Sequence, residues 1–246
     1  MTIKGVTAVL FDWDFTLAYA ISPNIQENEK LAILFQNHGI ACTKEQVSAA
    51  LKSLQEDISK GIVTGKLHPQ KRSDIVHKYR KLLNRLNHFD TSYEFAYEVY
   101  SGYARLPHFL FPEVRQTLEQ LKRCGIKMGV LSNHSCSARP VIEQFLIGFI
   151  PPASIMVSEE LGIHKPAKSI FQKAAARIKT PAEQIVYVGD NLAVDAIGSV
   201  NAGEYGMGIW VDRKGTGADA EIPENVVRIT TLAELGEMFC AEREVA

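Results

Sequence analysis

The sequence lacks the marks of several protein classes. Its 246 residues include four cysteines, and none lies in a Cys-x-x-Cys pair, so neither a zinc knuckle nor a thioredoxin-like motif is present. No run reaches the roughly 18 apolar residues that a membrane-spanning helix needs. Charge of one sign is not in excess either, because 27 Lys and Arg face 28 Asp and Glu. We therefore expect no membrane span and no strongly basic nucleic-acid coat.

What remains is the composition of an ordinary globular protein. Apolar residues make up 46% and charged residues 22% of the chain, which excludes a largely disordered or collagen-like chain. The first apolar run, residues 6–11, is short and is followed by two carboxylates, which does not fit a signal peptide. We therefore expect a cytoplasmic protein.

Short apolar runs alternate with stretches of helical period. In one such stretch, Val114, Leu118 and Leu121 share a helix face. The short apolar runs, in contrast, are typical of buried parallel strands. They occupy residues 6–11, 126–131, 155–157, 185–188, 206–211 and 226–229. Alternating strands and helices predict an α/β fold with a doubly wound parallel sheet.

One interval breaks the alternation. More than 100 residues separate the first strand from the second, and they contain no convincing strand. Helices are predicted over residues 24–36, from Thr43 with Gln46 in a capping box, and from Pro69. We therefore expect an all-helical domain, residues 18–108, inserted into an α/β core of residues 1–17 and 109–246.

Residues with chemically active side chains fall where the predicted strands end. Asp12 and Asp14 follow the first strand, Ser132 the second and Asp190 the fourth, while Lys165 lies in a loop after the third. Taken singly, each is more often a turn former, a helix cap or a surface lysine. Their occurrence at four successive strand ends favours a ligand site, because such sheets bind ligands at that edge.

The residue types indicate which ligand this is. Two carboxylates two residues apart after a buried strand are unfavourable unless a cation compensates them, and Mg²⁺ prefers oxygen ligands. Asp190 would add a third protein oxygen. Lys165 and Ser132 supply a positive charge and a hydroxyl, which suits a phosphate held between the metal and the lysine.

The stretches that carry these residues resemble the four motifs of the haloacid dehalogenase-like (HAD) hydrolase superfamily. They read FDWDFTL, LSN, SEELGIHKPAKSIF and VGDNLAVDAIGSVNAG, in the family's order. The resemblance implies a Rossmann-like core, and the inserted segment sits where phosphoglycolate phosphatase-like members carry a helical cap of type C1. Phe15 departs from the family, which usually has Gly there, and we expect its side chain to narrow the entrance.

The resemblance also implies roles for the motif residues. Asp12 would be the nucleophile that forms an aspartyl-phosphate, and Asp14 would be the general acid and then the base. Asp12, the backbone carbonyl of Asp14 and Asp190 would hold Mg²⁺. Residues expected to bind phosphate are Ser132, Asn133 and Lys165, and those expected to support the site are Asp195 and Asn191.

The expected function is hydrolysis of the phosphate monoester of a small metabolite. Dehalogenases of the family lack a carboxylate at the position of Asp14, and phosphonatases carry a small residue there. A phosphomutase would use the same core residues and stays open, as does a receiver-type switch domain that is phosphorylated but does not turn over. The sequence predicts neither the particular substrate nor the oligomeric state.

The inserted segment is locally basic. Residues 60–88 contain eight Lys and Arg and one acid, so they carry +7 and the remainder −8. The solvated face of the third helix is expected to carry Lys78, Lys81 and Arg85, whereas Arg72 and His68 are candidate substrate contacts. Nucleic-acid binding by this basic face is the alternative from a different class, although we expect no nucleic-acid partner.

Overall fold

The computed structural model describes residues 5–217 and 220–240. They form two compact units. Of the described residues, the first contains 5–19, 108–133, 139–217 and 220–240, and the second contains 20–107 and 134–138. These bounds differ from the predicted ones at residues 18–19, 108 and 134–138. In the second unit, Ser137 Oγ donates a hydrogen bond to the carbonyl of Ser101 at 2.7 Å.

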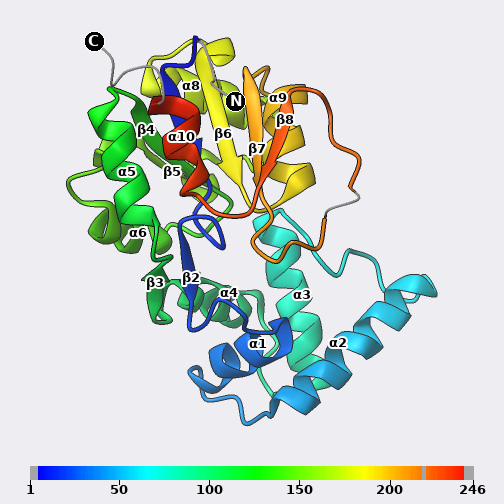
Figure 1. The fold of residues 1–246 in the computed structure, drawn as a ribbon. Coiled ribbons are helices and arrows are strands. Elements are labelled where there is room, and N and C mark those ends of the chain that lie inside the picture. Colours follow the sequence, from blue (N-terminus) through cyan, green and yellow to red (C-terminus); the bar gives the residue numbers. More distant parts are fainter. Residues whose placement is uncertain (1–4, 218–219, 241–246) are drawn as a thin grey trace. The chain divides into compact units, whose positions relative to one another are not determined.

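A six-stranded parallel sheet forms the centre of the first unit, in the order β5-β4-β1-β6-β7-β8 (Figure 1). Its strands are β1 (Ala8–Phe11), β4 (Lys127–Ser132), β5 (Ile155–Val157), β6 (Ile185–Gly189), β7 (Met207–Val211) and β8 (Val226–Ile229). The predicted doubly wound α/β class is thereby confirmed. The middle strand β1 pairs on both sides, Phe11 lying opposite Val130 and Val188, so three strand ends meet at one level of the sheet edge.

Helices flank this sheet (Figure 1). They are α5 (Val114–Arg123), α6 (Ala138–Leu146), α7 (Ser158–Leu161), α8 (Lys168–Ile178), α9 (Gly198–Asn201) and α10 (Glu234–Cys240). The apolar side of α8, including Ile170 and Phe171, packs on alternate strand residues such as Leu10 and Tyr187, as the period of two in a strand requires. A short π-helix, Leu192–Ile197, follows β6 and continues into α9.

The second unit is mainly helical. Its helices are α1 (Glu27–Gln36), α2 (Lys44–Ser59), α3 (Arg72–Arg85) and α4 (Tyr93–Gly102). The predicted capping box of α2 is confirmed: Thr43 Oγ1 accepts from the Gln46 amide at 3.3 Å, and Gln46 Oε1 accepts from the Thr43 amide at 2.8 Å. Both flanking helices begin three residues later than predicted.

Two short strands lie in the interval that was expected to contain none. β2 (Ala18–Ala20) and β3 (His108–Leu110) form a two-stranded sheet of their own. Just beyond them, the amide of Ile21 donates to the carbonyl of Pro107 at 2.7 Å. Runs of three residues carry too little periodicity to be recognised in a sequence.

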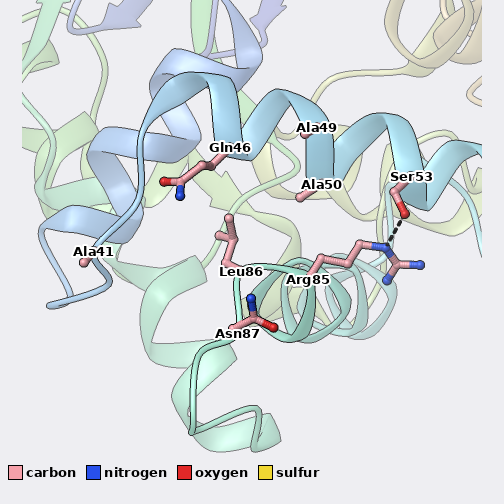
Figure 2. Close-up of a pocket in the computed structure, with 8 residues that line it drawn as sticks. All are labelled: Ala41, Gln46, Ala49, Ala50, Ser53, Arg85, Leu86 and Asn87. Atoms are coloured by element: carbon pink, nitrogen blue, oxygen red, sulfur yellow. Dashed lines mark hydrogen bonds between the residues drawn. The ribbon is translucent and has the colours of Figure 1, made fainter.

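The basic helix α3 is less solvated than its sequence predicted. The expectation that Lys78 faces solvent was wrong, because this side chain is buried and its Nζ lies 2.6 Å from Glu27 Oε1. Arg85 forms an ion pair with Asp57. Arg85 also donates to Ser53 of α2 at 3.4 Å, at the edge of a pocket of about 340 Å³ between α2 and the end of α3 (Figure 2). Ion pairs with acidic residues of the second unit therefore neutralise part of the positive charge of α3.

No helix in the described ranges is both long and apolar enough to cross a lipid bilayer.

Candidate active site

The candidate site is built at the end of β1. Asp12 follows the strand directly, and its amide donates to the carbonyl of Val188 at 2.9 Å, which continues the pairing of β1 with β6. Asp190 follows β6, and Ser132 is the last residue of β4. The parallel register thus brings residues from distant parts of the chain to one edge of the sheet, as the sequence predicted.

Lys165 is the best-connected side chain of the site. It is 2% exposed, and its Nζ lies 2.8 Å from Asp12 Oδ1, 2.7 Å from Asp195 Oδ1 and 2.7 Å from the Tyr187 hydroxyl. An ammonium group has three N–H donors, so every donor has an acceptor. Burial acts to lower the pKa of Lys165, but the carboxylates of Asp12 and Asp195 outweigh it and raise that pKa. The lysine therefore stays charged.

The backbone of Lys165 is fixed as well. Asn133 accepts from the Lys165 amide through Oδ1 at 2.8 Å and donates to the Lys165 carbonyl through Nδ2 at 3.0 Å. The resemblance assigned the Asn133 side-chain amide to phosphate binding. In the structure this amide forms hydrogen bonds with both the backbone N–H and the backbone carbonyl of Lys165. Asn133 joins the end of β4 to the loop after α7 and fixes the point from which the Lys165 side chain extends.

Asp195 is held by the start of the π-helix. Its Oδ2 accepts from the Asn191 amide at 3.1 Å, and Asn191 Oδ1 accepts from the Val194 amide at 3.0 Å. A Cβ atom at Gly189 would lie 2.4 Å from Asp195 Oδ2, closer than real Cβ contacts. Glycine at the end of β6 is therefore what lets the carboxylate approach the strand and reach Lys165.

Three carboxylates converge beside this lysine. Oxygens of Asp12, Asp190 and Asp195 all lie within 4.8 Å of one another. Burial, then repulsion from Asp12 and Asp195, raises the pKa of Asp190 well above its usual range. Burial and Asp12 also raise the pKa of Asp195, to about 6, against the opposing effect of Lys165.

This cluster fits a hard divalent cation. The Asp195 oxygens are engaged by Lys165 and Asn191, and one Asp12 oxygen by Lys165. In the ranges that the structure describes, the Asp190 carboxylate accepts no hydrogen bond. A half-buried carboxylate beside two buried ones lacks compensation that an Mg²⁺ ion would supply. Two of the predicted metal ligands, Asp12 and Asp190, lie in this cluster, and Asp195 is its third carboxylate. The predicted ligand from Asp14 is its backbone carbonyl, which stays a prediction.

Tyr187 is the site residue that sequence reasoning missed. Its hydroxyl, besides contacting Lys165, donates to the carbonyl of Leu131. Burial, followed by the charges of Asp195 and Asp12, raises the pKa of Tyr187, so the hydroxyl stays protonated. The sequence did carry one signal for this residue, a tyrosine within the apolar run of a predicted strand. A buried phenol hydroxyl usually needs a hydrogen-bond partner, so such a tyrosine indicates a polar group nearby.

The two residues proposed from the inserted segment belong to the second unit. The Arg72 guanidinium lies 5.8 Å from the centre of the Tyr97 ring. His68 is 70% exposed, and its Nδ1 lies 3.9 Å from Glu27 Oε2. The contact of either residue with a substrate stays a prediction.

Comparison with known proteins identifies the family. Residues 6–203 match the family model described as haloacid dehalogenase-like hydrolase. This match covers most of the chain, and it includes every residue of the site described above. The chain belongs to the haloacid dehalogenase-like hydrolases, as the four motifs indicated.

The curated relatives carry out different reactions. The chain is 34% identical over 117 residues to a glyceraldehyde 3-phosphate phosphatase from Methanopyrus kandleri. The aligned region covers 47% of this chain and 48% of the relative. It is 29% identical over 136 residues to a phosphoserine phosphatase from Thermus thermophilus (54% and 51% covered). It is also 31% identical over 130 residues to an (S)-2-haloacid dehalogenase from Pseudomonas fluorescens (51% and 54%). The chain thus matches about half the length of these relatives.

Solved structures resemble the chain over nearly its whole length. The HAD-hydrolase YfnB from Bacillus subtilis, solved bound to magnesium, has a TM-score of 0.67 at 20% identity and covers 94% of this chain and 96% of its own. A 2-haloacid dehalogenase from Pseudomonas syringae has a TM-score of 0.63 at 24% identity, with 95% and 97% covered. At these identities the likeness establishes the fold alone.

Proposed function

We propose that this chain is a Mg²⁺-dependent phosphatase that hydrolyses the phosphate monoester of a small metabolite. The observation that carries the proposal is the ion pair of Asp12 with the buried Lys165 beside the carboxylate cluster. Asp14, two residues beyond Asp12, supports a phosphatase over a dehalogenase. Two kinds of curated relative are themselves phosphatases, which supports the same choice.

The chain's own residues divide the work as follows. Asp195 fixes the Lys165 ammonium, and that ammonium holds the Asp12 carboxylate in one orientation. The second oxygen of Asp12 then attacks phosphorus and forms an aspartyl-phosphate as the bond from phosphorus to the alcohol oxygen breaks. Asp14 gives a proton to the departing alcohol oxygen, then takes one from the water that attacks the aspartyl-phosphate. Ser132 and the Lys165 charge stabilise the phosphoryl oxygens. Asp12, Asp190 and the Asp14 carbonyl would hold Mg²⁺, which neutralises charge on those oxygens.

A substrate panel tests this function. Purified protein with Mg²⁺ should release inorganic phosphate from at least one small phosphate ester, and EDTA should abolish the release. The panel includes phosphoglycolate, sugar phosphates, three-carbon phosphates, nucleoside monophosphates and pyrophosphate. Asp12→Asn should lower kcat by about a thousandfold or more because the nucleophile is lost. Asp74→Asn, which changes a carboxylate in the second unit, serves as the matched control.

The same panel separates the competing activities. Release of halide from a 2-haloacid, without phosphate release, would replace the proposal by a dehalogenase. Interconversion of two phosphate esters without net phosphate release would replace it by a phosphomutase. A stable phosphorylated Asp12 with no turnover would indicate a switch domain. Activity on none of the esters with Mg²⁺ present would refute the phosphatase.

A further inference from the structure

The turn that carries Asp14 has an unusual backbone. Phe15 has φ = 56°, in the left-handed region that a residue with a Cβ atom rarely adopts. Three hydrogen bonds close the turn: the Phe15 amide donates to Ala18 at 2.6 Å, and those of Leu17 and Ala18 to Trp13, both at 3.0 Å. The φ angle of Phe15 orients the peptide plane that contains the Asp14 carbonyl, so this strained residue sets where that carbonyl points.

One arginine from a distant part of the chain holds this turn. Arg213, two residues after β7, donates through Nε to the Phe15 carbonyl at 3.0 Å and through Nη2 to the Thr16 carbonyl at 2.7 Å. These are successive carbonyls directly after the strained φ angle. A planar guanidinium with several fixed donors can bind both at once, which a lysine ammonium on a flexible stem does less well.

The guanidinium itself is fixed on two further sides. Its Nη1 donates to Glu113 Oε1 at 2.7 Å, and its Cζ lies 3.5 Å from the centre of the Phe111 ring. The side chains of Arg213 and Glu113 are each 18% exposed. Burial acts to raise the pKa of Glu113, but the hydrogen bond and charge of Arg213, together with backbone hydrogen bonds, outweigh it and lower that pKa. Glu113 is therefore ionised at neutral pH and accepts a hydrogen bond from the Arg213 guanidinium.

We propose that Arg213 is a positioning residue for the reaction: it holds the Asp14 turn in the left-handed conformation that Phe15 alone disfavours. The sequence motifs do not include Arg213, and no hydrogen bond joins it to Asp12, Lys165 or Asp190 in the described chain. Its effect on the chemistry passes through the backbone of residues 14–16. The kinetic part of this inference rests on the proposed phosphatase activity, and the structural part does not.

Hydrogen exchange of the turn amides tests the structural part. In Arg213→Gln, the amides of Phe15, Leu17 and Ala18 should exchange at least several times faster than in the unmodified protein, because the turn opens more often. Arg139→Gln is the matched control, since Arg139 also bonds carboxylates and backbone carbonyls (Glu143, Glu160, Pro152 and Ile155) but none in this turn. Equal exchange of the three amides in both variants would overturn the proposal.

Kinetics tests the positioning. Arg213→Gln should lower kcat about ten- to a hundredfold with KM changed less than about twofold, because a small misplacement of a catalytic group acts on the chemical step. Arg213→Lys keeps the charge but not the two-carbonyl contact, so it should lose nearly as much. Adding Phe15→Gly to Arg213→Gln should restore part of kcat, since glycine accepts the positive φ without support.

The outcomes separate this inference from the proposed function. An unmodified protein that hydrolyses no ester refutes the phosphatase, while the exchange rates still decide whether Arg213 holds the turn. If Arg213→Lys keeps full kcat, only charge matters and the positioning role fails. It fails equally if Phe15→Gly gives no recovery in the Arg213→Gln background.

Discussion

The positively charged ammonium group of Lys165 is almost completely shielded from water, and it donates hydrogen bonds to three acceptors. Removing one partner of a buried charged group destabilises a protein by more than the net contribution of their interaction. The charged group that remains is still shielded from water and has no other group to compensate it. The three contacts differ in kind: Asp12 and Asp195 bring charge, whereas Tyr187 brings a neutral oxygen tied to β4 through the Leu131 carbonyl.

Tyr187→Phe should therefore reduce both the activity and the stability of the protein. The variant keeps the ring in the core but leaves one Lys165 donor and the Leu131 carbonyl without this partner, at about 1–3 kcal/mol of unfolding free energy. We expect kcat to fall about tenfold as the Lys165 ammonium loses its fixed position, measured by steady-state kinetics beside urea unfolding.

Tyr205→Phe is the control for this variant. It also removes a buried hydroxyl, which donates to the Phe171 carbonyl at 2.8 Å, and its ring centre lies 6.5 Å from that of Tyr187. The two variants should be similarly destabilised, and only Tyr187→Phe should lose kcat. Equal kcat values would show that the hydroxyl of Tyr187 is purely structural.

The site residues that could be predicted from the sequence are those that lie at or directly after the end of a strand. Asp12, Ser132 and Asp190 could be placed together because parallel strands end at one edge. The side-chain partners of Asn133 could not be foreseen, because an amide beside a phosphate site and one bonded to a neighbouring loop look alike in sequence. Arg213 was missed for a related reason: its partners are backbone carbonyls, which no residue type signals.

At the scale of single elements, α2 offers a clear test of local stability. Thr43→Ala removes the side-chain acceptor for the Gln46 amide, and loss of an N-cap destabilises a helix by about 1 kcal/mol. We expect a lower midpoint of urea unfolding when circular dichroism follows the helices. Thr43→Ser keeps the acceptor oxygen and should stay within a few tenths of a kcal/mol of the unmodified chain.

Elements were predicted well where local and tertiary preferences agree. The strands of the six-stranded sheet follow the predicted apolar runs to within two residues at each end, and the capping box fixes the start of α2. The error at Lys78 has a tertiary cause: its partner, Glu27, lies 51 positions earlier in α1. A helical wheel shows which face a residue is on but not which other helix supplies a carboxylate.

At the scale of the whole molecule, Mg²⁺ should stabilise the protein in a pH-dependent way. The pKa of Asp195 rises from 3.8 to about 6 on folding, and that of Asp190 rises as well. Between about pH 4 and 6 Asp195 thus binds more protons in the folded chain than in the unfolded one, so its ionisation reduces stability as pH rises through this window. Because Mg²⁺ binds the ionised carboxylates, its stabilising effect should be larger above this window.

Thermal unfolding at two pH values checks this expectation. Mg²⁺ at a hundred times its Kd should add about 2.7 kcal/mol, seen as a rise in Tm at pH 7.5, and the rise should be clearly smaller at pH 5. Asp190→Asn should lose most of the rise at both pH values, whereas Asp74→Asn should keep it. The same rise at both pH values would contradict the assignment of the cluster as the cation site.

The pairing of β2 with β3 has a consequence for how this chain can diversify. The chain departs through β2 and returns through β3, and these two strands are hydrogen-bonded neighbours. The ends of the intervening segment are thus already joined, and lengthening such a loop adds only slowly to its closure entropy. Segments of different length and origin can therefore be exchanged at this point without altering a single pairing of the six-stranded sheet. The insert can then change while the edge of the sheet that carries Asp12 and Asp190 is inherited intact.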